Sequence, residues 1–300
     1  MPTLLLVDGH AYAYRAFHAI RSLNGPDGRA TNAIFGFVKM LARMRGVVKP
    51  SHIAVVWDGG LSPERMVLLP EYKAQRPSMP DDLASQIDEI IAYLGAARIT
   101  SLLQDDVEAD DLIASLTKMA VQGGDAVVIA SADKDFFQLI SPSVGLLNPN
   151  DKSDTIWAAA QVLAKTGVEP AQVVDWLSLI GDSVDNIRGV PGVGPKTATD
   201  LLVRFGSIES LYGRLAEVKA EKLRESLRVA VDVVRRNQRM IRLKDDLPGL
   251  TPMNALVAAE PDYGSLVQLY QRWGFKGLAA EAEKLSQGEK DLFADASRLM

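Results

Sequence analysis

The sequence predicts an α/β protein whose central parallel sheet is flanked by helices and followed by a mostly helical second half. Helical patterns over about 33–45, 82–94 and 109–122 alternate with short apolar runs, which is typical of parallel sheets covered by helices. Three of these runs have the length and composition of buried strands, and each precedes an aspartate. They are residues 4–7 before Asp8, 53–57 before Asp58 and 126–130 before Asp133.

The remaining segments define the expected organisation. Residues 97–100 and 144–147 are weaker strand candidates. Residues 59–80 are polar and contain several prolines, which indicates a mobile insertion over the edge of the sheet. We therefore expect a core over residues 1–170, a helical region over 171–285 and a polar tail over 286–300.

The composition is that of an ordinary globular protein with a sizeable core. Of 300 residues, 47% are hydrophobic and 24% are charged. Cysteine is absent, which excludes disulfides, thiolate metal sites and a cysteine nucleophile, and fits a reducing compartment. The longest apolar runs are too short for a signal peptide or a membrane span, so we expect a cytoplasmic protein without a membrane partner.

Charge is unevenly distributed along the chain. Residues 186–244 contain 13 Lys and Arg against 6 Asp and Glu, a local net charge of +7, whereas the whole chain carries −5. The rest of the chain therefore carries −12. One region is acidic enough to collect cations and another is basic enough to face phosphates, although helix surfaces also vary in charge without any ligand.

Nine carboxylates stand at predicted strand ends and helix starts. The carboxyl ends of parallel strands meet at one edge of a sheet, so we expect these side chains to converge there. Any one of them could instead be a helix cap or complement a helix dipole. Glu108 and Asp111 share a helix face at i and i+3, as do Asp182 and Asp185. The full set is Asp8, Asp58, Glu108, Asp110, Asp111, Asp133, Asp135, Asp182 and Asp185.

Such a cluster favours metal ions. Like charges about 4 Å apart repel by about 4 kcal/mol at an effective dielectric near 20, so cations or protons must neutralise several of them. Oxygen ligands without cysteine select Mg²⁺ or Mn²⁺ over Zn²⁺. Two such ions would activate a water and stabilise the leaving oxygen in phosphoryl displacement.

A glycine-rich turn over residues 189–198 leads into a helix. Glycine lets backbone N–H groups approach phosphates, and a helix N-terminus favours anions. Lys196 adds a positive charge, and no group in the turn is base-specific, so the pattern indicates contact with a nucleic-acid backbone. The alternative is a tight helix–helix turn with no ligand.

Five motifs resemble one known family. They are Val7-Asp8-Gly9-His10, residues 72–77 (YKAQRP), residues 108–111 (EADD), residues 133–139 (DKDFFQL) and residues 181–186 (GDSVDN). Together they are similar to the 5′ nuclease domain of bacterial DNA polymerase I, whose family includes stand-alone 5′–3′ exonucleases and flap endonucleases. The resemblance extends over about residues 3–285.

The resemblance implies a fold and roles for the candidate residues. It implies a PIN-like core, a helical arch over residues 59–80, and a helix–three-turn–helix near 186–206 that binds duplex DNA with help from K⁺. The catalytic metal would be held by Asp8, Asp58, Glu108, Asp110 and Asp111, the second metal by Asp182 and Asp185, with Asp133 and Asp135 between the two. Lys73 and Arg76 correspond to arch residues that contact the scissile phosphate, Arg65 and Tyr72 to substrate-positioning arch residues, and Gly192, Gly194, Lys196 and Thr197 to the duplex-binding turn.

The implied substrate is DNA with 5′ ends or 5′ flaps, with RNA primers on DNA as a further candidate, and a monomer is expected. The sequence does not decide between exonuclease and flap endonuclease activity. One alternative is a DNA-binding module that has lost cleavage, although no carboxylate is missing. Another is a haloacid-type phosphatase, which Gly9 and His10 after Asp8 disfavour. Departures from the family pattern include Met66 in place of a common histidine and Gly59 in place of a common alanine.

Overall fold

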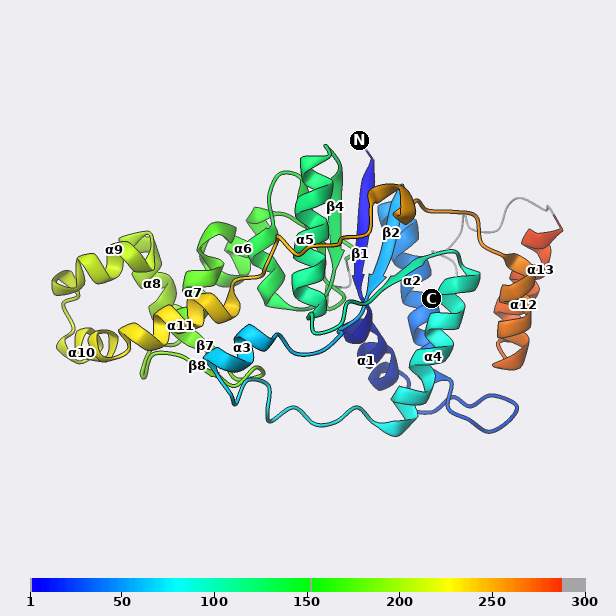
Figure 1. The fold of residues 1–300 in the computed structure, drawn as a ribbon, viewed down its shortest axis with the longest axis horizontal. Coiled ribbons are helices and arrows are strands. Elements are labelled where there is room, and N and C mark those ends of the chain that lie inside the picture. Colours follow the sequence, from blue (N-terminus) through cyan, green and yellow to red (C-terminus); the bar gives the residue numbers. More distant parts are fainter. Residues whose placement is uncertain (1, 152, 288–300) are drawn as a thin grey trace.

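The structure is a computed structural model that describes residues 2–151 and 153–287. Its centre is a six-stranded sheet in the order β3-β2-β1-β4-β5-β6, in which only β6 is antiparallel to its neighbour. The predicted parallel sheet is thereby confirmed (Figure 1). The strands are β1 (Thr3–Asp8), β2 (His52–Val56), β3 (Thr100–Leu102), β4 (Ala126–Ala130), β5 (Val144–Leu147) and β6 (Ile156–Trp157).

Side chains of β1 alternate between two hydrophobic cores, one on each face of the sheet. Leu5 and Val7 pack with α1 (Gly9–Ala19), α2 (Asn32–Val48) and α4 (Asp81–Ala96). Leu4 and Leu6 pack on the other face with α5 (Ala109–Gln122) and α7 (Val173–Ile180). This alternation follows from the two-residue period of a strand. Because both faces are covered, β1 reads as a continuous apolar run.

The second half of the chain divides into two parts. Figure 1 shows α8 to α11 at one end of the molecule and α12 and α13 at the opposite end. The last two helices pack in the core of α2 and α4, so the helical region expected over 171–285 is not one body. The remaining elements are α6 (Ala159–Thr166), α8 (Pro195–Phe205), α9 (Ile208–Gly213), α10 (Glu221–Val229), α11 (Val231–Ile241), α12 (Tyr263–Arg272) and α13 (Lys276–Ser286), the hairpin of β7 (Gly181–Asp182) and β8 (Ile187–Arg188), and the 3-10 helices η1 (Lys134–Leu139), η2 (Pro170–Gln172), η3 (Leu215–Glu217) and η4 (Met253–Leu256).

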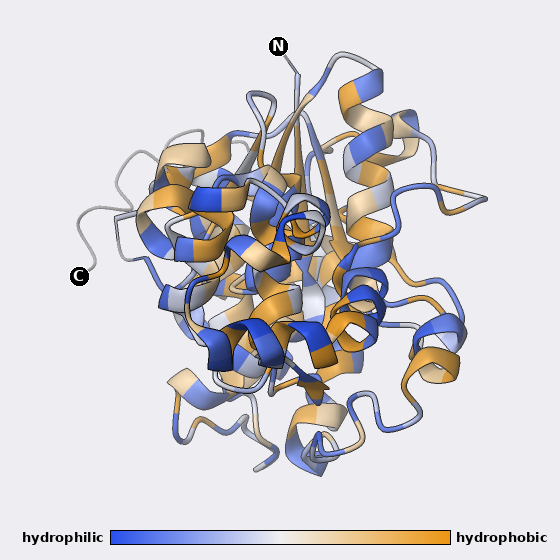
Figure 2. Ribbon diagram, turned by 90° about the vertical axis from the view of Figure 1, so that its left-hand side faces the viewer, coloured by the Kyte–Doolittle hydropathy of each residue, from blue (hydrophilic) through white to orange (hydrophobic). Residues whose placement is uncertain are grey.

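The helices are amphipathic. In Figure 2 the strands are mostly hydrophobic and lie behind helices whose outward turns are hydrophilic. Among the described helices, none is long and apolar enough to cross a membrane. Of the polar tail expected over 286–300, Ser286 ends α13, and residues 288–300 lie outside the described residues.

The segment over residues 59–80 differs from the expected mobile insertion. It contains α3 (Pro63–Leu68), which begins at a Ser62 cap with proline in its first turn. Arg65, Leu69, Tyr72 and Lys73 are buried, and Leu69 and Tyr72 belong to the hydrophobic core on the α5 face. We keep the name arch for residues 59–80. Its polar sequence concealed this packing because buried ion pairs hold much of it.

Candidate active site

Asp8 lies at the point of the sheet where the strand order reverses, since β2 and β3 follow on one side of β1 and β4 and β5 on the other. It ends β1, which pairs with β2 on one side and β4 on the other, and ligands of open α/β sheets bind beyond such a point. Its Oδ1 accepts the N–H of Ala11 at 3.0 Å and so caps α1, and its Oδ2 accepts the hydroxyl of Ser131 at 2.9 Å. The cap interpretation of this strand-end aspartate is therefore confirmed, and its role as a metal ligand stays a prediction.

Asp58 fixes the start of α5 from the end of β2. Its Oδ1 accepts the N–H of Ala109 at 2.9 Å, and its Oδ2 lies 3.1 Å from Nδ1 of His10. Burial acts to raise the pKa of Asp58, but these hydrogen bonds hold that pKa below its ordinary value. His10 was not among the predicted site residues. The sequence indicated His10 only by its place two residues after Asp8. Its partner Asp58 is 48 positions away, so no local spacing could reveal this contact.

Asp133 repels three other carboxylates, which come from three separate segments of the chain. Burial is the largest cause that raises the pKa of Asp8, to about 6, and the charges of Asp58 and Asp133 raise it further, against hydrogen bonds that lower it. Burial and then Asp133 raise the pKa of both Asp110 and Asp135 well above the ordinary range. Burial also raises the pKa of Asp133. Asp133 therefore lies close enough to Asp8, Asp110 and Asp135 for its charge to act on each of them.

One atom of this group has no partner. Oδ1 of Asp135 is buried and accepts no hydrogen bond. A buried carboxylate oxygen without a donor is costly, so this atom fits a site that takes a cation. The neighbouring atoms that could bind a metal ion are carboxylate oxygens, which suit Mg²⁺ or Mn²⁺.

The β7–β8 hairpin brings Asp182 and Asp185 to the same group. Their charges act on the pKa of Asp135 and Asp133. Asp182 pairs with Lys134 at 3.0 Å, and Asp185 pairs with Arg76 at 2.6 Å. Lys134 lies in the motif over residues 133–139, but the sequence predicted no role for it.

The arch closes over these acids. Lys73 contacts Glu108 Oε2, and its ammonium is 4.0 Å from Asp185 Oδ2. The Tyr72 hydroxyl donates to Glu108 Oε2 at 3.0 Å and lies 3.3 Å from Asp185 Oδ2. Tyr72 and Lys73 are buried, whereas the side chain of Arg76 is 44% exposed.

Backbone contacts fasten the arch to the hairpin. The N–H of Lys73 donates to the carbonyl of Asp185 at 3.1 Å, and Asn186 Nδ2 donates to the carbonyl of Glu71 at 2.8 Å. Gln75 Nε2 also contacts the carbonyl of Ser183. Lys73 has a φ of 55°, a left-handed conformation that costs an L-residue about 1–2 kcal/mol. These contacts must hold it there.

Arg65 does not lie where a substrate-positioning residue was expected. It is buried, its guanidinium is bidentate to Asp111 at 2.7 and 2.8 Å, and it binds Glu108 Oε1 at 3.0 Å. Asp111 thus faces Arg65 rather than the other carboxylates. The shared face of Glu108 and Asp111, predicted from their spacing, is confirmed by this common partner.

Within residues 2–151 and 153–287, no three acidic or histidine side chains are placed so that one metal ion could contact them all. Arch cations occupy three predicted ligands: Arg65 pairs with Glu108 and Asp111, and Arg76 pairs with Asp185. Metal coordination by the nine carboxylates therefore stays a prediction.

The glycine-rich turn is open to solvent. Gly192 has a φ of 80°, which favours glycine, and Gly194 is the N-cap of α8. Both glycines and Lys196 are exposed, and Thr197 is half-buried in the first helical turn. The predicted arrangement of a turn leading into a helix is confirmed, and its contact with DNA stays a prediction.

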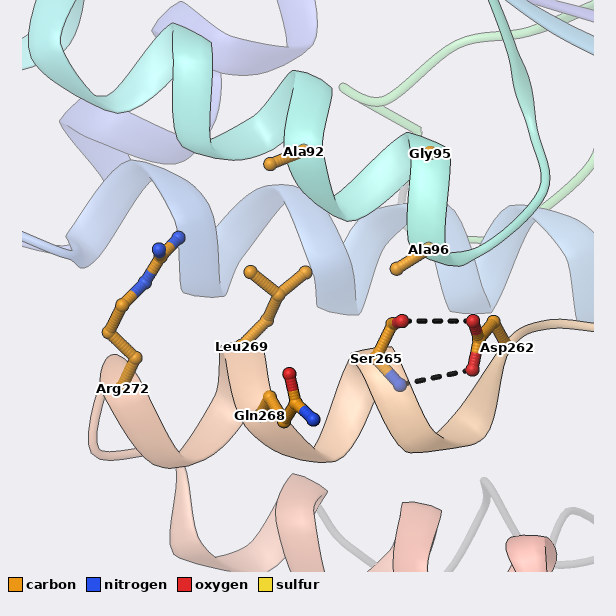
Figure 3. Close-up of a pocket in the computed structure, with 8 residues that line it drawn as sticks. All are labelled: Ala92, Gly95, Ala96, Asp262, Ser265, Gln268, Leu269 and Arg272. Atoms are coloured by element: carbon orange, nitrogen blue, oxygen red, sulfur yellow. Dashed lines mark hydrogen bonds between the residues drawn. The ribbon is translucent and has the colours of Figure 1, made fainter.

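A groove of about 530 Å³ lies between α4 and α12, outside the acidic group. Figure 3 shows Asp262 turned toward Ser265, whose backbone N–H and hydroxyl it accepts at 3.0 and 2.9 Å as the cap of α12. The remaining lining includes Ala92, Gly95 and Leu269. The carboxylate of Asp262 is therefore used as a cap.

Sequence comparisons decide the family. Residues 3–167 match the N-terminal resolvase-like domain of 5′-3′ exonucleases, and residues 168–264 match their C-terminal SAM fold. The chain belongs to the 5′-3′ exonuclease family. A 5′-3′ exonuclease of Aquifex aeolicus (strain VF5) is 36% identical over 285 residues, which cover 95% of this chain and 96% of that protein. DNA polymerase I of Bacillus caldotenax is 34% identical over 96% of this chain, which spans only 33% of the polymerase.

Solved structures share the fold of this 5′-3′ exonuclease family member. The flap endonuclease D15 of bacteriophage T5, in a complex with DNA and metal ions, has a TM-score of 0.67 at 20% identity and covers 95% of this chain and 99% of that one. The catalytic core of Rad2 with a DNA substrate has a TM-score of 0.63 at 18% identity, with 95% and 91% covered. The predicted α/β nuclease fold with a helical region is thereby confirmed.

Proposed function

We propose that this protein is a divalent-metal-dependent 5′ nuclease that hydrolyses DNA phosphodiester bonds at a 5′ end or 5′ flap. The observation that carries the proposal is the position of Asp8 at the end of β1 beside β4, hydrogen-bonded to Ser131 and close enough to Asp133 for their charges to interact. Their repulsion is tolerable only with protons or cations present. Membership of the 5′-3′ exonuclease family supports the same reaction.

The proposed ligands are the carboxylates that act on one another, together with Glu108. Asp111 is left out because its oxygens pair with Arg65 and the N–H of Lys244. The oxygens of Glu108 are also paired, but its partners Tyr72 and Lys73 join it to Asp185. Mg²⁺ or Mn²⁺ bound there in a pair would supply an activated water and stabilise the leaving oxygen. Metal ions are present in the related T5 enzyme with DNA, and zinc in another T5 5′-exonuclease structure, which supports divalent-metal use. The set is Asp8, Asp58, Glu108, Asp110, Asp133, Asp135, Asp182 and Asp185.

Lys73 and Arg76 are the proposed phosphate-binding groups of the arch. Lys73 pairs with Glu108, and Arg76 pairs with Asp185. Each is therefore within reach of a phosphate placed beside these two carboxylates. A guanidinium matches two phosphate oxygens, and a buried ammonium stabilises developing negative charge. Tyr72 would orient Glu108 through its hydroxyl.

The turn around Gly192, Gly194, Lys196 and Thr197 is the proposed duplex site. Free N–H groups at the start of α8 and the Lys196 charge suit the phosphate backbone. Weaker binding of a duplex by Lys196→Met, with a smaller salt dependence, would support this. K⁺ binding here stays a prediction, tested by comparing duplex affinity in K⁺ and in tetramethylammonium.

The deciding experiment compares a 5′-labelled flap duplex with a blunt duplex, each in Mg²⁺ and in EDTA. We expect product only with the metal, and none from Asp135→Asn although it still binds DNA. Binding without product in both Mg²⁺ and Mn²⁺ would favour the inactive DNA-binding module. The relative rates on the two substrates separate flap endonuclease from exonuclease activity.

Three further aspects belong to this proposal. An RNA primer on DNA is a candidate substrate, since DNA polymerase I is among the relatives, and a 5′-RNA–DNA duplex tests it. A monomer is predicted and is checked by light scattering. A cytoplasmic location is also proposed, because the proposed substrate is DNA.

A further inference from the structure

Arg65 joins three elements that are far apart in the sequence. From α3 it donates Nε to the carbonyl of Met240 at 2.8 Å and Nη2 to the carbonyl of Arg242 at 3.3 Å, at the end of α11. Its other N–H groups bind Glu108 and Asp111 at the start of α5. A guanidinium has five N–H donors, and all five are used. At 4% exposure, none is free for DNA.

Asp111 belongs to a stripe of α5 that holds the chain after α11. Its Oδ1 also accepts the N–H of Lys244 at 2.9 Å. Four residues on, Ser115 donates to the carbonyl of Lys244 at 3.1 Å, and Lys118 pairs with Asp245 at 2.9 Å. Positions i, i+4 and i+7 share a helix face. Asp110 lies about 100° around the helix, where Asp133 and Asp8 act on it.

We propose that Asp111 is the counter-ion of Arg65 rather than a metal ligand, and that this pair lets the end of α11 position Glu108. Arg65 holds Glu108 Oε1, and Asp111 holds Arg65 by two hydrogen bonds. Since α11 packs against α7 in the region that carries the duplex-binding turn, the pair connects that region to the acidic group. Both are positioning residues. The role of Glu108 in cleavage rests on the proposed function, whereas the pair itself does not.

A double-mutant cycle in EDTA tests the pair without reference to activity. Arg65→Met and Asp111→Asn each leave a buried charge with too few partners, so each should lower the urea midpoint clearly. The double variant should lower it by less than the sum of the two. The control is Lys118→Met with Asp245→Asn, an exposed pair between α5 and the chain after α11, whose effects should be small and additive. If Arg65→Met fails to fold, Arg65→Lys takes its place in the cycle.

Metal and DNA titrations distinguish positioning from direct contact. Asp135→Asn loses a proposed ligand and should lower Mg²⁺ affinity by about tenfold or more. The double variant keeps every proposed ligand and should lower it by less. Arg65→Met should lower kcat but leave the salt dependence of DNA binding unchanged, whereas Lys196→Met should reduce that slope by about one. A purely structural role would leave kcat per folded molecule unchanged.

Two results would overturn the inference. One is an additive cycle for Arg65 and Asp111. The other is a loss of Mg²⁺ affinity in Asp111→Asn as large as in Asp135→Asn and not restored by Arg65→Met. Coupling in EDTA together with absent cleavage of every substrate would leave the pair in place and reject the proposed function instead.

Discussion

The ammonium of Lys73 contacts the carboxylate of Glu108, and both side chains are buried. Lys73 reaches this position with a φ of 55° and with its N–H on the carbonyl of Asp185. The arch lysine is therefore built into the acidic group instead of moving freely above it. A cation of the protein neutralises Glu108 here, and a substrate phosphate or a metal ion would compete for the same charges.

Removal of the Lys73 charge should impair chemistry more than DNA binding. For Lys73→Met we expect kcat to fall by about 10²-fold or more, because an electrostatic contact at the reacting phosphate is lost. Affinity for a flap duplex in Ca²⁺ should change far less. Single-turnover cleavage and fluorescence anisotropy measure the two quantities. Exposed Lys39→Met on α2 is the control, and equal losses of kcat and affinity in Lys73→Met would contradict the assignment.

Asp135→Asn should stabilise the metal-free protein. Removing one of several repelling charges favours the folded state, since Oδ1 of Asp135 has no hydrogen bond to lose. Mg²⁺ should raise the melting temperature of the wild type, and that of the variant by less. At a hundred times its Kd, a ligand that binds only the folded state adds about 2.7 kcal/mol to the free energy of unfolding. Thermal unfolding in EDTA and in Mg²⁺ checks both signs. Exposed Asp232→Asn should behave as the wild type, and a wild-type curve unmoved by Mg²⁺ would count against the site.

Asp8 should make the metal-free protein less stable as the pH rises. Its pKa is about 6 in the folded chain against 3.8 ordinarily, so the folded state holds a proton that the unfolded state releases. Stability from this group is present below about pH 4 and is lost as the pH rises through 6. Asp8→Asn should therefore gain about 1–3 kcal/mol over the wild type at pH 7 and almost nothing at pH 4.

Denaturant unfolding in EDTA at the two pH values measures this difference. Asparagine can still cap α1 through its carbonyl oxygen, so the substitution tests charge more than capping. Asp88→Asn on the exposed face of α4 is the control. A gain that is the same at both pH values would show that the Asp8 carboxylate titrates as in the unfolded chain.

Gly59 should not accept the alanine that is common at its place in the family pattern. A Cβ there would lie 1.9 Å from the carbonyl oxygen of Gln104, and backbone atoms cannot move aside cheaply. We expect Gly59→Ala to cost about 1–3 kcal/mol. Gly46→Ala within α2, where a Cβ meets nothing within 4 Å, should instead gain up to about 1 kcal/mol. Equal stability of Gly59→Ala and the wild type would place the 104–106 loop differently.

Local patterns in the sequence were sufficient for β1, β2, β4 and β5, whereas the strand expected over 97–100 is β3 at Thr100–Leu102 and β6 was not predicted. β4 and α5 have the predicted bounds, and the ends of β1 and β4 meet because parallel neighbours must share an edge. The same patterns gave the turn before α8. These features depend on residues a few positions apart and on a general rule of sheet topology.

Which partner each acid faces was decided by the tertiary structure. Spacing put Glu108 and Asp111 on one helix face, but Arg65 meets them from 43 and 46 positions away, and its carbonyl partners are 175 and 177 positions away. His10 and Asp58 meet across 48 positions. No period in the chain encodes such distances.

By itself the sequence determined the sheet, the helices that cover it and the supply of carboxylates at one edge. Only the tertiary structure decided that the polar arch is packed, and that Asp111 faces a buried arginine while Asp110 faces other acids. The physical reason is that secondary structure follows from side-chain period, whereas pairing of buried charges depends on which distant backbone brings a counter-charge into the same low-dielectric space.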